Sequence, residues 1–120
     1  SSNKSISHAT IHDNDAEGIK VGESTSGVGK ATITSSLVTS NGGYGLWLVT
    51  GSTASLSYTG LSGNAKGSIK ATTGLTTKTN NTQAPGYIST SAASSSYLRI
   101  STSSYQYTAG QSGKPIGARY

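Results

Sequence analysis

Three residues of the chain carry side chains suited to hold an acidic sugar polymer: Lys20, Lys70 and the single tryptophan, Trp47. An indole offers a flat apolar face to a sugar ring, and ammonium groups pair with carboxylates or sulfates. The same side chains also suit a contact without any ligand, in which the lysine stems pack on the indole as cation–π pairs. Both interpretations require the three residues to lie side by side, although 27 and 23 positions separate them in the chain.

A second candidate site is the acidic turn HDNDAEG at residues 12–18. Asp13, Asp15 and Glu17 place three carboxylates within five residues, and Ca²⁺ prefers such oxygen ligands. The segment lacks the full ligand spacing of an EF-hand loop, so a solvated turn without metal is the competing interpretation. His8 and His12 are four residues apart, a spacing that brings imidazoles together on a helix but not in strands and turns. Apart from this Ca²⁺ ion, no cofactor is expected.

An internal repeat relates the lysines and the tryptophan to one another. The segment at residues 30–49, KATITSSLVTSNGGYGLWLV, recurs 27 positions earlier and 23 positions later. The matching residues are Ile6, Ile11, Asn14, Gly18 and Ile19 in the first copy, Ile33, Val38, Asn41, Gly45 and Leu46 in the second, and Leu56, Leu61, Asn64 and Ile69 in the third, where Ser68 takes the glycine position. A repeat of about two dozen residues is typical of stacked coils rather than of separate domains.

Each copy ends in a short alternating segment: Ile19-Lys20-Val21, Leu46-Trp47-Leu48 and Ile69-Lys70-Ala71. Alternation with a period of two predicts a strand with one buried face, and one copy alone cannot bury that face. The copies must therefore stack. Stacking places Lys20, Trp47 and Lys70 in one outward column, and it places Asn14, Asn41 and Asn64 in a ladder of amide side chains.

The pattern I-x4-I-x2-N-x3-G-I-x-V at residues 6–21 resembles the coil repeat of right-handed parallel β-helices of the pectate-lyase-like superfamily. Residues 5–71 carry the resemblance as about three coils, and residues 103–119, with AG and terminal IGA, are similar to the segment that closes many such helices. The resemblance implies an all-β fold, a right-handed parallel β-helix (solenoid) with about three recognisable coils plus a C-terminal cap. It also implies an extracellular or cell-surface location.

The whole chain, residues 1–120, is expected to form a single β-helix segment. Residues 1–5 are predicted to be a frayed lead-in, and residues 72–120 to form degenerate coils and the C-terminal cap. Within that cap, Tyr105, Tyr107 and Tyr120 are expected to cover the end of the core. The longer connection at residues 22–29, GESTSGVG, is a candidate binding excursion on one face of the solenoid.

Composition agrees with a narrow core. The chain has 32% hydrophobic residues and no cysteine, which excludes a disulfide scaffold and a thiolate metal site. No segment is long and apolar enough to span a membrane. The net charge is +5, yet all four acidic residues lie within residues 1–23, and seven Lys and Arg residues without any acid follow. Such a surface attracts anionic polymers, although the charge also serves solubility alone. A nucleic-acid partner is not expected.

The sequence thus predicts a structural, carbohydrate-associated β-helix segment of an extracellular or surface protein, with an anionic polysaccharide as partner. One alternative is the C-terminal part of a pectate, alginate or chondroitin type polysaccharide lyase. The resemblance implies a Lys or Arg base there, beside a uronate carboxylate that Ca²⁺ or another Arg neutralises. Lys20, Lys70, His12 and the acidic turn are candidates for these parts, but no motif brings them together. Catalysis by this chain alone is not expected.

The other alternative is a self-assembling extracellular fibre subunit. In that case a second β-helix chain stacks on the open N-terminal end and produces a homo-oligomer or filament. Ice binding ranks below these hypotheses, because Thr32-Ile33-Thr34 is the one T-x-T motif in the coils and does not recur at the repeat offsets.

Overall fold

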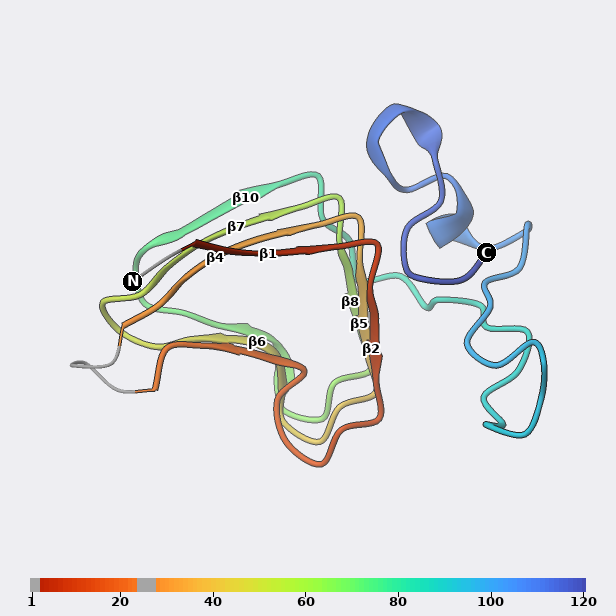
Figure 1. Ribbon diagram of the computed structural model, residues 1–120, viewed down its shortest axis with the longest axis horizontal. Coiled ribbons are helices and arrows are strands. Elements are labelled where there is room, and N and C mark those ends of the chain that lie inside the picture. The colour runs from red at the N-terminus through yellow and green to blue at the C-terminus, as the bar shows by residue number, and fades with distance from the viewer. Residues whose placement is uncertain (1–2, 24–27) are drawn as a thin grey trace.

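The computed structural model describes residues 3–23 and 28–120, and its regular structure is almost entirely strand (Figure 1). The ten strands are β1 (Asn3–Ser7), β2 (Thr10–His12), β3 (Ile19–Val21), β4 (Lys30–Thr34), β5 (Leu37–Thr39), β6 (Tyr44–Leu48), β7 (Thr53–Ser57), β8 (Gly60–Ser62), β9 (Gly67–Lys70) and β10 (Leu75–Lys78). Two 3₁₀ turns follow, η1 (Tyr105–Tyr107) and η2 (Gln111–Gly113). Neither helix of the described residues has the length or apolar character that crossing a membrane requires.

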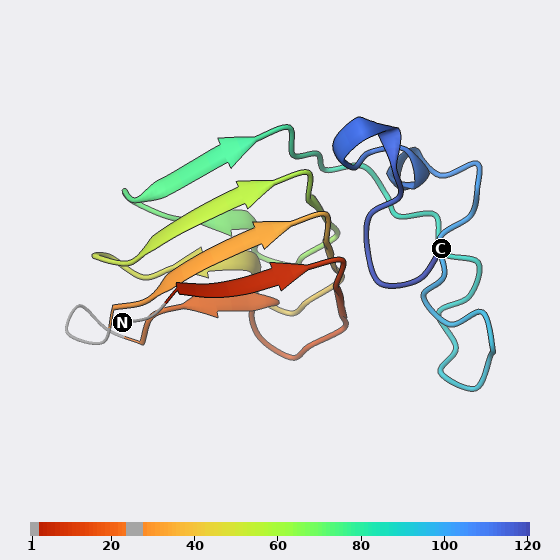
Figure 2. The same cartoon turned by 45° about the horizontal axis from the view of Figure 1, so that its top comes forward.

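The strands form three parallel sheets, and each of the three complete coils contributes one strand to each sheet. Sheet 1 has the order β1-β4-β7-β10, sheet 2 the order β2-β5-β8, and sheet 3 the order β3-β6-β9. All the neighbouring strands run parallel, and the coils lie one above another in Figures 1 and 2. The chain is therefore a parallel β-solenoid of about three turns, which confirms the predicted all-β solenoid.

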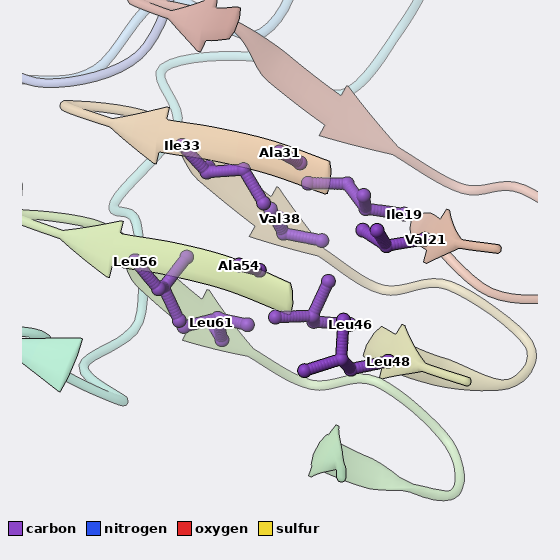
Figure 3. Close-up of a cluster of buried hydrophobic side chains, with 10 residues drawn as sticks. All are labelled: Ile19, Val21, Ala31, Ile33, Val38, Leu46, Leu48, Ala54, Leu56 and Leu61. Atoms are coloured by element: carbon purple, nitrogen blue, oxygen red, sulfur yellow. The ribbon is translucent and has the colours of Figure 1, made fainter. Parts of the chain in front are cut away.

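The observed register equals the repeat that the sequence predicts. Ile33 pairs with Ile6 below and Leu56 above, and Leu46 pairs with Ile19 and Ile69. These side chains point into the solenoid, where they form a narrow apolar column (Figure 3). Its buried members are Ile19, Val21, Ala31, Ile33, Val38, Leu46, Leu48, Ala54, Leu56 and Leu61. A low apolar content suffices because each coil supplies only a few of these residues.

The coils extend beyond residues 5–71 at both ends. Asn3 pairs with Lys30, so residues 3–5 belong to strand β1 and are not a frayed lead-in; residues 1–2 lie outside the described part. Strand β10 adds a fourth strand to sheet 1, and a bridge from Asn81 to Gly60 extends sheet 2. The sequence search missed this last partial coil because its register is offset by 21 residues and Thr77 takes the apolar position opposite Leu56.

Residues 82–120 cover a side of the solenoid rather than the end of its core. Leu37 of β5 points outward from sheet 2 and packs, fully buried, with Ile100 and Ile116. The residues that pack against the apolar column near its end are Ile69 and Leu75, which belong to the coils and not to the C-terminal segment. Figure 2 shows the C-terminal segment beside sheet 2. The predicted position of the tyrosines over the core end is therefore wrong: Tyr107 joins the lateral cluster, while Tyr105 and Tyr120 are exposed.

Two short segments of this region, residues 87–89 and 97–100, lie side by side. They pair with each other through isolated bridges, Tyr87 with Ile100 and Ser89 with Tyr97. Gln106, which is fully buried, ties the segment to the last coil, because its amide donates to Asn81 Oδ1 at 2.7 Å and accepts from Asn81 Nδ2 at 3.0 Å.

Candidate functional site

The three asparagines form a continuous ladder at the turn between sheets 2 and 3. Asn14 Nδ2 donates to Asn41 Oδ1 at 2.8 Å, and Asn41 Nδ2 donates to Asn64 Oδ1 at 2.8 Å. Each of these oxygens also accepts the backbone N–H of the asparagine in the coil below, at 3.0 and 3.1 Å. Amide ladders of this kind satisfy the turn's polar groups in every coil, so their role is structural.

The ladder explains why the repeat contains a glycine. A Cβ on Gly18 would lie 2.8 Å from the Asn41 amide nitrogen, and a Cβ on Gly45 would lie 2.8 Å from that of Asn64. Each glycine therefore leaves room for the asparagine of the next coil. The third copy can carry Ser68 at this position. Asn64 is the last asparagine of the ladder, so the third copy does not have to leave room for another one.

Lys20, Trp47 and Lys70 lie in one column on the outer surface of sheet 3. Trp47 pairs in register with Lys20 of β3 and Lys70 of β9. The ammonium nitrogens of both lysines lie 4.5 Å from the centroid of the indole ring, and that of Lys70 also lies 5.8 Å from the ring of Tyr44. Both lysines are exposed and Trp47 is half-buried. The structure thus combines the predicted column with the cation–π contacts of the ligand-free interpretation.

This geometry changes what Trp47 can do. Ammonium groups from the strands on either side already lie over the indole, so little of its face is free for a sugar ring. The charged ends of the lysines remain in water, because both residues are exposed. The column therefore presents two positive charges whose positions the indole restricts.

The acidic turn does not gather its carboxylates. No group of three or more His, Cys, Asp or Glu side chains converges within residues 3–23 and 28–120. Asp13 has a left-handed backbone with φ 61°, Asp15 is exposed, and the carboxylate of Glu17 packs against Gly43. The binding excursion predicted at residues 22–29 lies partly outside the described residues, which omit 24–27.

The two histidines have different surroundings. His8 is exposed at the turn between β1 and β2, with φ 50°. His12 lies on the outer face of sheet 2, where its Nδ1 shares a 2.9 Å hydrogen bond with the buried hydroxyl of Thr39. Lys20 and Lys70 are on sheet 3, so the candidate groups of the lyase alternative are distributed over two sheets.

A set of polar contacts that the sequence did not indicate joins the coils to the C-terminal segment. Thr39 Oγ1 lies 2.7 Å from the phenol oxygen of Tyr87, and the ring of Tyr87 meets that of His12 edge to face at 5.3 Å. Burial raises the pKa of the Tyr87 phenol above its ordinary value, although the hydrogen bond with Thr39 opposes the shift. No sequence motif links Tyr87 to Thr39, 48 residues away.

We expect stability to decrease above about pH 10, where unfolded tyrosine ionises, because the fold favours the neutral phenol of Tyr87. Its contribution is fully present below that pH and is lost as the pH rises through the folded pKa. Tyr87→Phe should lower stability at neutral pH by about 1 kcal/mol, the value of one hydrogen bond, and should flatten the alkaline decrease. Urea unfolding from pH 8 to 11 measures both effects.

Tyr120→Phe, an exposed control, should retain the alkaline decrease in stability. Equal pH curves for Tyr87→Phe and Tyr120→Phe would contradict the assignment of this decrease to Tyr87.

The fold and its stacked asparagines define a parallel β-solenoid of the β-helix class. A family model described as right handed beta helix region matches residues 1–65, which is more than half of the chain. The chain belongs to this family. No curated protein matches the chain, and no solved structure does.

Proposed function

We propose that this β-helix segment binds an acidic polysaccharide through the outer surface of sheet 3. The observation that carries the proposal is the pair of ammonium groups that Lys20 and Lys70 hold over Trp47, each 4.5 Å from the ring centroid. The lysines are two strands apart, which corresponds to roughly 9.5 Å along the solenoid. Two positive charges in a row parallel to the axis suit a polymer that repeats carboxylates or sulfates.

The indole contributes by restricting the lysines. A lysine side chain normally loses considerable rotamer entropy when it binds a ligand. Here the cation–π contacts reduce that freedom before binding, so less entropy remains to be lost. Trp47 therefore acts as a support for two ionic contacts, and not as a stacking platform.

The distribution of charge supports the same ligand class. All four acidic residues lie in the first 23 residues, and Lys30, Lys66, Lys70 and Lys78 follow without any acid in the later coils. An extended polyanion is drawn toward such a surface, and the attraction weakens as salt screens the charges. Binding that persisted unchanged at high salt would contradict an ionic mechanism.

Fluorescence of Trp47 tests the proposal directly, because it is the one tryptophan of the chain. Titration with polygalacturonate should change the emission of the wild-type protein, and a fully methyl-esterified polymer should not. Lys20→Gln with Lys70→Gln should weaken binding about tenfold, since two exposed ion pairs together contribute about 1.4 kcal/mol.

The matched control is Lys78→Gln with Lys114→Gln. These lysines are also exposed and their loss changes the net charge equally, but Lys78 is on sheet 1 and Lys114 in the C-terminal segment. The control should bind like the wild type apart from a small long-range effect. Equal weakening in both double variants would show that total charge, and not the Lys20–Trp47–Lys70 column, determines binding.

A further inference from the structure

The outer surface of sheet 1 carries an array of hydroxyl groups that the sequence does not reveal. Strand pairing aligns two outward columns, one of Ser5, Thr32, Ser55 and Thr76, and one of Ser7, Thr34, Ser57 and Lys78. Every position except Lys78 bears a hydroxyl. The T-x-T motif of β4 is therefore continued by S-x-S in β1 and β7, which a search for repeated threonines cannot detect.

The array is accessible. Its residues are exposed on β1 and β10 and half-buried on β4 and β7. A shallow groove of about 590 Å³ is lined by residues of all four strands, among them Thr32, Ser55 and Thr76 of one column and the neighbouring Lys30 and Thr53. The C-terminal segment covers sheet 2, so sheet 1 stays open to solvent (Figures 1 and 2).

Its spacing is regular in two directions. Neighbouring strands of a sheet lie about 4.8 Å apart, and successive outward residues of one strand lie about 6.6 Å apart. Threonine is stiff at χ1, and hydrogen bonds restrict the hydroxyls further: Ser57 Oγ donates to Thr34 Oγ1 at 3.3 Å, and Asn3 Nδ2 donates to Thr32 Oγ1 at 3.2 Å. A regular two-dimensional array of this kind fits a ligand that is itself periodic in two dimensions.

We propose that sheet 1 binds the surface of ice. Each hydroxyl offers one donor and two acceptors, the same groups through which water joins a lattice. The outward residues of β1, β4, β7 and β10 include no aromatic side chain, whereas stacking on sugar rings uses aromatic faces. Lys78 stands at the end of one column, and Lys30 lies beside the array and outside both columns, so the centre of the array is uncharged. Ordered water therefore suits this face better than a glycan does.

This activity is independent of the polysaccharide site, because the two faces belong to different sheets. The Lys20→Gln and Lys70→Gln double variant should bind ice like the wild type. The failure of one proposal therefore leaves the other intact.

The experiment measures thermal hysteresis and the inhibition of ice recrystallisation by the purified chain. The wild type should separate the melting and freezing temperatures and shape growing ice crystals. Thr34→Lys, which places a long charged side chain in the centre of the array, should abolish both effects. Thr50→Lys, which adds the same charge at an exposed turn, should leave them unchanged.

Circular dichroism at 4 °C shows whether each variant is folded, and Ser55→Lys replaces Thr34→Lys if the latter is not. Absence of hysteresis and of recrystallisation inhibition in the folded wild type would overturn the proposal. Equal activity of the wild type and the array variants would also overturn it. Retention on microcrystalline chitin without any effect on ice would overturn it as well and would assign the array to a crystalline glycan.

Discussion

Replacing Asn41 by Ala is expected to lower the free energy of unfolding by about 3 kcal/mol, through lost hydrogen bonds and a cavity. Asn41 is the middle residue of the ladder and is 1% exposed. Its side-chain oxygen accepts two hydrogen bonds from Asn14, and its amide donates to Asn64 Oδ1 and, at 3.4 Å, to the carbonyl of Ile11. Alanine removes all four.

The loss is large because few of the released groups reach water. The side chain of Asn41 lies next to Gly18, where no Cβ exists to fill the vacated space. The carbonyl of Ile11 and the oxygen of Asn64 each lose a donor inside the turn. Leaving a buried polar group unsatisfied costs about 1–3 kcal/mol, which exceeds the net value of the bond itself.

Urea unfolding of Asn41→Ala measures the effect, and Asn14→Ala is the matched control. Asn14 lies at the exposed end of the ladder, so its removal should cost about 1 kcal/mol, as for an ordinary hydrogen bond. Equal losses in the two variants would show that the ladder is not cooperative with the core. A loss in Asn41→Ala below that of Asn14→Ala would contradict its assigned role.

The coils were predictable because the residues that build them recur in kind. Asparagine and glycine recur together since one must leave room for the other, as Gly45 does for Asn64. A second polar column, at the turn between sheets 1 and 2, was not predictable. There Ser36, Thr59 and Asn80 each hydrogen-bond a backbone carbonyl near the end of a sheet 1 strand. Their chemistry repeats but their residue types do not.

The candidate sites followed a similar rule. Register placed Lys20, Trp47 and Lys70 together, since a constant offset in a solenoid determines which side chains are neighbours. Closeness in sequence carries less information than register: Asp13, Asp15 and Glu17 lie within five residues, yet no group of three such side chains converges in the part of the chain that the structure describes. The hydroxyl array was not predicted for the same reason as the second polar column. Serine and threonine both carry a hydroxyl group, but they are different residue types, so a comparison of residue types between the copies does not detect the repeat.

One signal in the sequence did indicate the lateral position of the C-terminal segment. Leu37 and Val38 are adjacent apolar residues in a three-residue strand, and adjacent side chains of a strand point to opposite faces. Val38 belongs to the interior column, so Leu37 must be covered from outside. Both faces of β5 are buried, which is the pattern of a strand between two layers.

Leu37→Ala is therefore expected to release the C-terminal segment without unfolding the coils. Leu37 is fully buried against Ile100 and Ile116, and truncating a buried leucine costs about 2–5 kcal/mol. The segment is otherwise attached by a few polar contacts, such as the bond from Gly117 N–H to the Ser35 carbonyl at 2.8 Å. Most of its docking free energy should thus be lost.

Hydrogen exchange followed by mass spectrometry distinguishes local release from global unfolding. In Leu37→Ala, amides of residues 82–120 should exchange much faster while those of β4, β5 and β7 stay protected. Val38→Ala, one residue further along the same strand, points inward and should instead weaken protection throughout the coils. If both variants accelerated exchange in the same peptides, the lateral segment and the solenoid would form one cooperative unit. That result would mean the coils need the cover on sheet 2 as much as they need their own apolar column.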